Sequence, residues 1–389
     1  MIETLFDRRP RWLAGDGPES SIVLGSECTV LRNLGDLPFP ARCSEDELHA
    51  AEERIRAALD GTDLMTTGRY CPLSTFHSRD TRFLAERRLV VLDLMRGAGT
   101  SGSRHVQIPQ GAYVAEDQSM SVMINRADHL GIRVLASGLQ LQEAWARACL
   151  VDDTLSTLLD FAFDDRYGYL TSDLSHVGTG LRAVLVLHLP ALSMVENKMP
   201  DLVELANERH QLLRGVKPVV SVEKEAPGAG HKMHVCEALY GDLYGTFAGP
   251  VSEAVGDMYM LSNVSTLGVS EEEILFHVRH VAEDLIEKEK KARRVLREER
   301  RPWLEDRVWR AVGLAANARM LGFVESLVLL SSIRLGVSLG LLENHSFAEL
   351  NRLLLDSQSV HLEIQDGQEC DELALSMKRA DLFRRQIAG

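Results

Sequence analysis

The feature that most constrains this chain is a long stretch, residues 270–301, with the pattern of one uninterrupted charged helix. Ser270 is followed by three glutamates, which places an N-cap hydroxyl and acidic side chains where the helix dipole favours them. Apolar side chains recur at helical spacing at Ile274, Val278, Val281, Leu285, Ala292 and Leu296. Further helical segments, punctuated by glycines, continue toward residue 389. The sequence therefore predicts a mixed α/β part over residues 1–268 and a wholly helical part over residues 269–389.

The first part alternates between helix and strand patterns. Residues 45–60 predict a helix that begins after an N-cap serine. Short apolar runs at 120–124 and 132–135 predict two adjacent strands joined by a turn. Residues 181–188 fit either a buried strand or a short buried helix, because periodicity alone does not distinguish the two. Residues 207–237 mix charged side chains, histidines and glycines, and we expect a surface insertion there.

Charge and cysteine usage exclude several classes of protein. The chain has 43 Lys and Arg against 57 Asp and Glu, a formal net charge of −14, which argues against a nucleic-acid surface. No apolar run approaches the roughly 20 residues that a membrane-spanning helix needs, and the N-terminus lacks the apolar core of a signal peptide. The six cysteines are scattered and form no CxxC pair, which is typical of reduced thiols. We therefore expect a cytoplasmic protein without nucleic-acid or membrane partners.

Two short motifs contain side chains suited to anion binding or proton transfer. Residues 178–182 place two glycines before an arginine, so that the backbone can approach an anion and the guanidinium can pair with it. The same residues also fit a tight loop followed by a surface arginine. His129 follows Asp128 beside a predicted strand, as an acid or base or as a hydrogen-bonded turn residue. Another set has the spacing of metal ligands but no evident fourth member, so no metal site is predicted: His231, His234 and Cys236.

Three stretches together resemble a known family. Residues 165–192 contain Tyr-Gly-Tyr-Leu-Thr-Ser, Val-Gly-Thr-Gly-Leu-Arg-Ala and His-Leu-Pro-Ala-Leu. Residues 252–268 contain Ser-Glu-Ala-Val-Gly, Leu-Ser-Asn and Thr-Leu-Gly, and residues 304–336 contain Leu-Glu-Asp-Arg-Val-Trp-Arg and Arg-Leu-Gly. In this order they resemble the ATP:guanido phosphotransferases, specifically the bacterial protein-arginine kinases. The resemblance implies an α+β fold, a phosphagen-kinase-type antiparallel sheet flanked by helices, followed by an all-helical C-terminal dimerisation domain.

The arginines that the family uses around ATP are largely replaced in this sequence. The family transfers the γ-phosphoryl group of Mg-ATP to a guanidinium nitrogen, and arginines neutralise the phosphates and the transition state. The resemblance aligns the family's Ser-Ser-Arg-x-Arg motif so that Ser26 is kept, while Glu27 and Thr29 replace the two arginines. A third arginine, from Asp-His-x-Arg, becomes Gly131, and the alignment places Tyr240 at a fourth.

Some positive charge is retained near the implied nucleotide site. Arg88 replaces a nucleotide-contacting histidine of the family, and Arg182 survives in place. The neighbouring Arg133 is expected to point to the other side of its strand. The resemblance implies these residual nucleotide-binding positions: Ser26, Glu27, Thr29, Arg88, Gly178, Thr179, Gly180 and Arg182.

The carboxylates of the family are also replaced. The family's Asn-Glu-Glu-Asp-His segment is Asn-Arg-Ala-Asp-His here, so Arg126 and Ala127 occupy both glutamate positions. One of those glutamates orients and deprotonates the guanidinium substrate in the family. Asp128 is kept, and Asp173 takes the place of a family cysteine near the guanidinium. These two aspartates are the candidate catalytic bases if the chain is active.

A second family site, in the helical part, is altered as well. Active protein-arginine kinases carry Arg-Asp-x-x-Arg-Ala there, which forms a pocket for phosphoarginine. This sequence keeps only Arg379 and Ala380 of that motif. Without the aspartate, a guanidinium ligand has no carboxylate for a bidentate pair. Arg379 is thus either a remnant of the pocket or an exposed helix arginine.

The combined losses predict a catalytically degenerate pseudokinase that acts by protein binding or regulation. The resemblance implies a homodimer, or a heterodimer with an active family member, and a protein partner of the stress-proteolysis type. The alternative is an active protein-arginine kinase with a rearranged phosphate clamp and Mg-ATP as its cofactor. That clamp would combine Arg182 and Arg88 with a third cation, supplied by Arg133 or Lys217. A third class of function is binding of another anion at the loop around Gly178.

Overall fold

The computed structural model describes residues 2–65, 67–91, 109–194, 198–216, 219–223, 234–238 and 248–388. Lys217, His231 and Tyr240 lie outside the described residues, and so do the side chains of His234 and Cys236. Within the described part, no group of three or more His, Cys, Asp or Glu side chains could hold a metal ion. None of the described helices combines the length and apolar character needed to cross a membrane.

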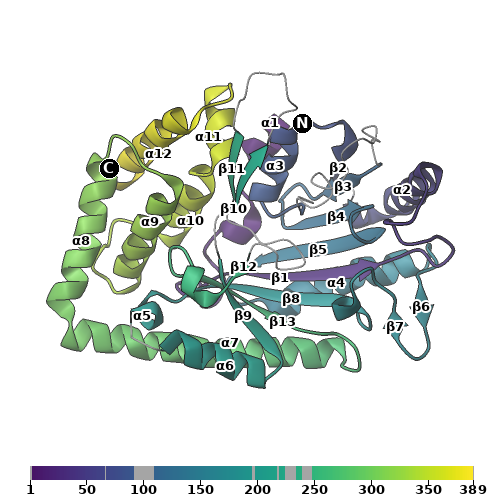
Figure 1. Cartoon of the computed structure of the whole chain (residues 1–389), viewed down its shortest axis with the longest axis horizontal. Coiled ribbons are helices and arrows are strands. Elements are labelled where there is room, and N and C mark those ends of the chain that lie inside the picture. Colours follow the sequence, from purple (N-terminus) through teal and green to yellow (C-terminus); the bar gives the residue numbers. More distant parts are fainter. Residues whose placement is uncertain are drawn as a thin grey trace.

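Nine strands of the described residues form one antiparallel sheet (Figure 1). The strands lie in the order β12-β9-β13-β8-β1-β5-β4-β3-β2. Their bounds are β1 Val23–Arg32, β2 Arg69–Pro72, β3 Gly111–Val114, β4 Met120–Ile124, β5 Leu130–Ser137, β8 Leu181–His188, β9 Gln211–Val216, β12 Ala248–Gly249 and β13 Met258–Asn263. The two adjacent strands expected near residues 120–135 are β4 and β5. Residues 181–188 are strand β8, since they pair with a strand on each edge.

Strand β9 corrects the expected surface insertion at residues 207–237. Gln211–Val216 pairs with β13 and buries Leu213 in the main core, so these residues belong to the central sheet. Beyond it, β10 Val219–Glu223 and β11 His234–Ala238 form a separate hairpin. The charged side chains, histidines and glycines that suggested an insertion lie before and after β9, so the short strand between them was included in it.

Alternation along each strand divides the side chains between two covered faces of the sheet. One face packs against α2, α4, α6 and α7, and the other against α3, the N-terminal segment and helices α8 to α12 (Figure 1). The bounds are α1 Ile2–Phe6, α2 Glu45–Asp60, α3 Ser78–Glu86, α4 Leu141–Ser156, α5 Pro190–Ser193, α6 Lys198–Glu208, α7 Glu271–Glu299, α8 Arg301–Asn317, α9 Phe323–Ser338, α10 Phe347–Asp356, α11 Ser359–Asp366 and α12 Glu372–Ile387. A residue at the sheet centre is therefore shielded from water on either face.

Helix α7 connects the sheet to the helical part of the chain. It begins with a capping box in which Ser270 and Glu273 bond reciprocally, as the serine before the three glutamates predicts. Its first half packs on the sheet through Ile274, Val278 and Val281. The helix ends at Glu299, and α8 starts at Arg301 as a separate helix. The single long helix predicted over residues 270–301 is therefore α7, and it belongs to the core of the sheet.

A buried carboxylate on α7 joins this helix to the start of α5. Glu289 is fully buried and accepts hydrogen bonds from the backbone N–H groups of Ala191 and Leu192, at 3.1 and 2.9 Å. Its Oε1 also lies 2.7 Å from Nε of Arg293. Burial raises the pKa of Glu289, while Arg293 acts in the opposite direction. The carboxylate therefore neutralises a buried guanidinium and satisfies the start of α5 at the same time.

Replacing Glu289 by alanine is expected to lower the free energy of unfolding by about 3 kcal/mol, because it leaves Arg293 and two backbone donors buried without their acceptor. Urea unfolding followed by circular dichroism measures this loss. The matched control is Glu283→Ala on the same helix, whose ion pair with Arg279 is exposed. The control should cost under about 1 kcal/mol. Equal losses in the two variants would contradict the role of Glu289.

Candidate functional site

A cluster of polar side chains crosses the centre of the sheet on the face covered by α3 and the C-terminal helices. Thr29 of β1 lies opposite Arg133 of β5 on one side and opposite Arg182 of β8 on the other. Glu27 lies two residues before Thr29 and so faces the same way. Arg88, from the turn after α3, reaches the same place and pairs with Glu27. All five side chains are buried, and we call them the central polar cluster.

Glu27 is the anionic centre of this cluster. Its Oε2 lies 2.5 Å from an Nη atom of Arg88, and its Oε1 lies 3.3 Å from Nε of Arg133. The Thr29 hydroxyl donates to the same Oε1 at 3.3 Å. Burial alone would raise the pKa of Glu27, but the guanidinium groups of Arg133 and Arg88 outweigh burial and, with a smaller effect of Arg182, lower it to about 2. Glu27 is therefore ionised and paired at any physiological pH.

The position of Arg133 corrects an expectation from the sequence. We expected its side chain to point away from the implied phosphate site, yet it contacts Glu27 and donates to the backbone carbonyl of Arg88 at 3.0 Å. Residues two apart on a strand share a face, so Arg133 lies on the same side as Gly131, where the resemblance places a family arginine. The expectation was wrong because side chains alternate between the two faces of a strand with a period of two residues, which returns residue 133 to the face of residue 131. Two of the cations suggested for a rebuilt phosphate clamp, Arg88 and Arg133, are bound to Glu27.

The aromatic ring of Trp12 lies next to the cluster. A Cβ atom at Gly25 would come within 3.3 Å of this ring, so glycine there leaves room for the indole. The guanidinium carbon of Arg88 lies 6.0 Å from the ring centre. Ser26 points to the opposite face of the sheet, where its hydroxyl donates to the Gly138 carbonyl at 2.7 Å. The apolar cover strengthens the charge interactions inside the cluster, whereas the retained serine does not take part in them.

The glycine loop before Arg182 is explained by close packing. A Cβ atom at Gly178 would lie 2.3 Å from the Thr266 carbonyl oxygen, and one at Gly180 would lie 2.6 Å from the Leu31 carbonyl oxygen. Both glycines also have positive φ, at 121° and 67°. From the other side of the sheet, an Nη atom of Arg32 donates to the carbonyl of Thr179 at 2.9 Å. The loop sequence is therefore required by the fold, with or without a bound anion.

Arg32 is itself held in place on the face of the sheet that α4 covers. Its other Nη atom lies 2.6 Å from the carboxylate of Asp152 on α4, and its guanidinium stacks on the ring of Tyr169 at 3.4 Å. Both charged partners are buried. This arrangement fixes the loop that leads into β8, and with it the place of Arg182 on the opposite face.

Asp128 and His129 serve as structural ties between loops. One carboxylate oxygen of Asp128 accepts hydrogen bonds from Asn33 Nδ2 and from the backbone N–H of Ser172, both at 2.7 Å. Burial raises the pKa of Asp128, which those bonds partly offset. His129 Nδ1 accepts from the backbone N–H of Leu34 at 3.3 Å, and burial lowers its pKa to about 4. His129 is thus a neutral, hydrogen-bonded turn residue, the second of the two readings that the sequence left open.

The remaining candidates on the substrate side are tied to nearby loops. Asp173 caps a short helical turn by accepting from the backbone N–H and the hydroxyl of Ser175, at 2.9 and 2.8 Å. Arg126 donates to Gln110 Oε1 at 2.6 Å and to the carbonyl of Val91. At Ala127, the second family glutamate position, only the backbone carbonyl offers an acceptor, and it binds the Ser172 hydroxyl at 2.7 Å. Asp128 directly follows the two family glutamate positions in the chain, and Ser172 contacts both it and the Ala127 carbonyl.

Sequence reasoning missed one arginine, Arg214. It lies on β9 opposite Met260 of β13, and Met260 in turn lies opposite Val186 of β8. Val186 and Arg182 are four residues apart on β8 and share a face, so Arg214 lies on the same face as Arg182. Gly215 follows Arg214, and residues 250–254 pack closely against it. A Cβ atom at position 215 would lie 2.8 Å from Pro250 O. The signal was an Arg-Gly pair at the end of an apolar run. The resemblance instead places Tyr240 at the fourth arginine position, and Tyr240 lies outside the described residues.

Arg379 is fully buried in the helical part. Its Nε donates to the carbonyl of Ser357 at 2.8 Å, and an Nη atom donates to the carbonyl of Leu321 at 3.1 Å. Its guanidinium also lies 5.2 Å from the ring of Phe323. The neighbouring Ala380 is likewise buried. Arg379 is therefore not an exposed helix arginine; it holds α12 to the ends of neighbouring helices.

Two family models match this chain. The model described as ATP:guanido phosphotransferase, C-terminal catalytic domain, matches residues 50–227 and 235–292. The model described as Protein-arginine kinase McsB C-terminal domain matches residues 301–389. Together they cover every strand of the sheet except β1, most of helix α7 and the helical part. The first match ends and the second begins near the end of α7.

Relatives and solved structures agree with these matches. A protein named protein-arginine kinase from Symbiobacterium thermophilum is 37% identical over 97% of this chain and 97% of its own length. One of the same name from Moorella thermoacetica is 33% identical over 99% of both chains. The crystal structure of lombricine kinase matches with a TM-score of 0.53 at 21% identity, over 72% of this chain and 69% of that chain, which shows a shared fold. The chain therefore belongs to the ATP:guanido phosphotransferase family, in its protein-arginine kinase branch.

Proposed function

We propose that this family member is a cytoplasmic pseudokinase, which keeps the protein-arginine kinase fold and acts by binding other proteins. The single observation that carries the proposal is the paired, ionised Glu27 in the central polar cluster. Its partners would be a second copy of the chain, an active protein-arginine kinase or a component of stress proteolysis. Members of the family use Mg-ATP, and the negative charge of Glu27 would weaken the binding of ATP by this chain.

Glu27 opposes nucleotide binding in two ways. Its own negative charge would repel the phosphates, and at about 4 Å and an effective dielectric near 20 one such pair is worth about 4 kcal/mol. It also engages Arg88 and Arg133, so a phosphate would have to compete with a carboxylate that is already in place and desolvated. Both effects act in a buried cluster, where solvent screening is weak.

The substrate side lacks the chemistry of phosphoryl transfer to arginine. Loss of a general base typically costs about 10²- to 10⁴-fold in rate. At the family glutamate positions the chain has Arg126 and Ala127, and Arg126 would repel a guanidinium. Asp128 already accepts two hydrogen bonds through one oxygen, and Asp173 caps a helical turn. Both aspartates are therefore engaged in structural hydrogen bonds rather than left open to a substrate.

One observation favours the alternative of an active kinase. Three guanidinium groups act on the single carboxylate of Glu27, those of Arg88, Arg133 and Arg182. The cluster therefore has more positive than negative charge, and an anion would lower its energy. Nucleotide binding by the unmodified protein is the result that would support this alternative.

The pseudokinase proposal predicts that calorimetric titration with Mg-ATP up to millimolar concentration gives no saturable heat, and that no phosphoarginine forms on an arginine-rich protein. Glu27→Gln is expected to tighten Mg-ATP binding at least about tenfold, because it frees two guanidinium groups and removes the repulsion. The matched control is Glu305→Gln, which removes an exposed partner of Arg301 and should change nothing.

A micromolar dissociation constant for Mg-ATP in the unmodified protein would contradict the proposal that Glu27 opposes nucleotide binding. Phosphoarginine formation that is lost in Asp128→Asn or Asp173→Asn would overturn the pseudokinase proposal itself and assign a base. Nucleotide binding without phosphoarginine would leave a nucleotide-responsive binding protein, in which Glu27 does not exclude ATP.

Acid unfolding offers a test of the Glu27 pairs. Since the pKa of Glu27 falls from 4.5 to about 2 on folding, its stabilisation is complete above pH 4.5 and is lost as the pH falls toward 2. The difference in free energy of unfolding between the unmodified protein and Glu27→Gln should therefore shrink by about 2 kcal/mol between pH 5 and pH 3. Urea titrations at the two pH values measure it, and a constant difference would show that Glu27 is not ion-paired.

The helical part offers a surface for a second copy of the chain. Large apolar side chains are exposed on three of its helices, which is unusual for a surface that stays in water. They are Trp303, Trp309 and Leu314 on α8, Val324 and Val328 on α9, and Leu373 and Met377 on α12. We propose homodimerisation through this surface, as the family resemblance also implies.

The dimer proposal predicts twice the chain mass in light scattering coupled to size-exclusion chromatography. Val324→Lys with Val328→Lys places two charges on one face of α9 and should yield a monomer with unchanged circular dichroism. Val264→Lys with Leu267→Lys is the matched control, because Val264 is 48% exposed, as is Val324, but lies after β13. A monomeric unmodified protein, or dissociation by both pairs alike, would contradict this interface.

A further inference from the structure

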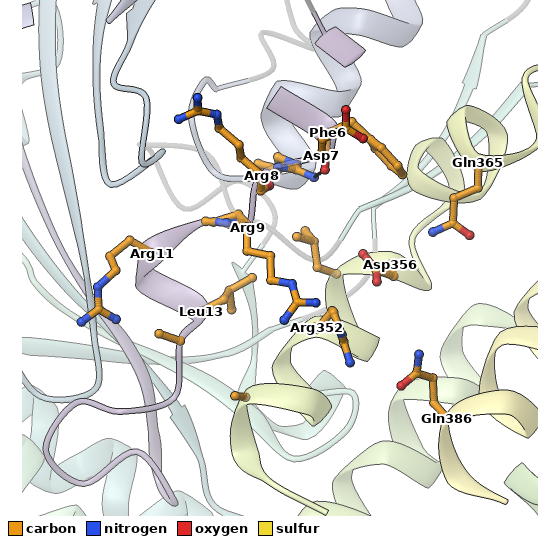
Figure 2. A pocket seen from close by; sticks show the side chains of 15 residues that line it. Phe6, Asp7, Arg8, Arg9, Arg11, Leu13, Arg352, Asp356, Gln365 and Gln386 are labelled. Atoms are coloured by element: carbon orange, nitrogen blue, oxygen red, sulfur yellow. Dashed lines mark hydrogen bonds between the residues drawn. The ribbon is translucent and has the colours of Figure 1, made fainter. Parts of the chain in front are cut away.

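A cavity of about 550 Å³ lies between the N-terminal segment and the C-terminal helices (Figure 2). Residues 6–14 form one wall, and α10, α11 and α12 form the other. A cavity of this volume is in the range of small-molecule sites. Neither the proposed pseudokinase function nor the resemblance of the sequence uses this cavity.

The wall formed by the N-terminal segment is held rigidly by Arg87. This buried arginine donates to three backbone carbonyls of the segment, those of Leu5, Phe6 and Arg8, at 2.7, 3.2 and 2.8 Å. It also donates to Gln118 Oε1 at 2.7 Å, and its Nε lies 3.1 Å from His361 Nε2 on α11. Arg87 thus fixes the backbone of the segment against α11. Side chains that follow in the segment are placed over the cavity before any ligand arrives, which lowers the entropy cost of binding.

The arginines around the cavity fall into two groups. Arg8 pairs with Glu116 at 2.5 Å, and Arg11 pairs with Asp16 at 2.8 Å, so each has an acid of its own outside the cavity. Arg9 and Arg352 point into the same space, next to Asp356 (Figure 2). They form the group that faces the cavity.

Positive charge exceeds negative charge where Arg9 and Arg352 meet. The carboxylate of Asp356 is acted on by Arg352, Arg87 and Arg9, as well as by His361. Burial nevertheless raises the pKa of Asp356, which weakens it as a counter-charge. Three guanidinium groups thus act on one partly buried carboxyl group, and Asp7 is the other carboxylate of the lining. The arginines of the lining outnumber these two acids, which favours an added anion.

Two neutral amides complete the lining. Gln365 of α11 and Gln386 of α12 extend their side chains toward the same space from the far wall (Figure 2). Amide N–H groups add hydrogen bonds to an anion without adding charge, while guanidinium groups bind phosphate oxygens in pairs. The combination is typical of a site for a compact anion with several acceptor oxygens.

We propose that this cavity binds a small phosphate-bearing anion, held by Arg9 and Arg352 with help from Gln365 and Gln386. The ligand is either a free inorganic phosphate such as pyrophosphate or the phosphate groups of a small ester. It contacts the N-terminal segment on one side and α10 to α12 on the other, so binding links the first residues of the chain to the helical part. The site is separate from the central polar cluster and does not depend on nucleotide binding there.

Calorimetric titration with pyrophosphate, without magnesium and at constant ionic strength, tests the proposal. We expect one site per chain and a rise in melting temperature, because the ligand binds only the folded chain. Arg9→Gln with Arg352→Gln should weaken binding at least tenfold. Arg8→Gln with Arg11→Gln removes the same total charge but replaces arginines that have their own acids, so it should weaken binding less than threefold.

Two further experiments identify the ligand and locate its binding site. A sugar bisphosphate that binds more tightly than pyrophosphate identifies a phosphate ester, and the reverse order identifies the free anion. Arg182→Gln should leave pyrophosphate binding unchanged, since Arg182 belongs to the central polar cluster. No binding by the unmodified protein, equal weakening by the two double variants, or loss of binding in Arg182→Gln would each overturn the proposal.

Discussion

A carboxylate in the middle of a sheet that is covered on both faces must be neutralised from within the protein. Glu27 meets this requirement with Arg88 from the turn after α3 and Arg133 from β5. Because ionised groups are costly to bury unless they are paired, these three side chains depend on one another. The turn after α3, the two central strands and the cover formed by Trp12 are therefore fixed together, around the place where the resemblance implies a phosphate site.

Several other arginines of this chain likewise serve the fold. Arg32 pairs with Asp152 beneath the sheet, Arg87 binds the carbonyls of the N-terminal segment, and Arg379 binds carbonyls at helix ends. Arg334 of α9 donates to the Ser20 carbonyl at 2.5 Å and to Asn351 Oδ1 at 2.6 Å, which joins the helical part to the start of β1. Guanidinium groups suit this use because they offer five donors in a fixed plane. An arginine kept at a family position is therefore weak support for ligand binding, whereas an arginine aimed into a cavity is stronger support.

The local elements were largely predictable from the sequence, because their causes are local. Ser44 and Ser270 both form capping boxes with a glutamate three residues later, and the apolar runs near residues 120–135 form β4 and β5. Prediction from the sequence was wrong where a short strand lies between polar segments, or where the direction of a side chain had to be known. Strand β9 was taken for part of an insertion, and Arg214 was missed with it. Of the candidate site, the replaced arginines and glutamates could be read directly, since residue identity needs no structure.

What the sequence determined by itself was the family, several of the helices and strands, and which residue types stand at the positions that the resemblance assigns to the site. Only the tertiary structure decided what the substituted side chains do instead. The pairing of Glu27 with Arg88 joins residues 61 positions apart in the chain, and the cavity at Arg9 and Arg352 joins the first turn of the chain to its last helices. Such contacts depend on strand register and on how helices cover a sheet, which are set by packing across the whole molecule and leave no pattern in the sequence around either residue.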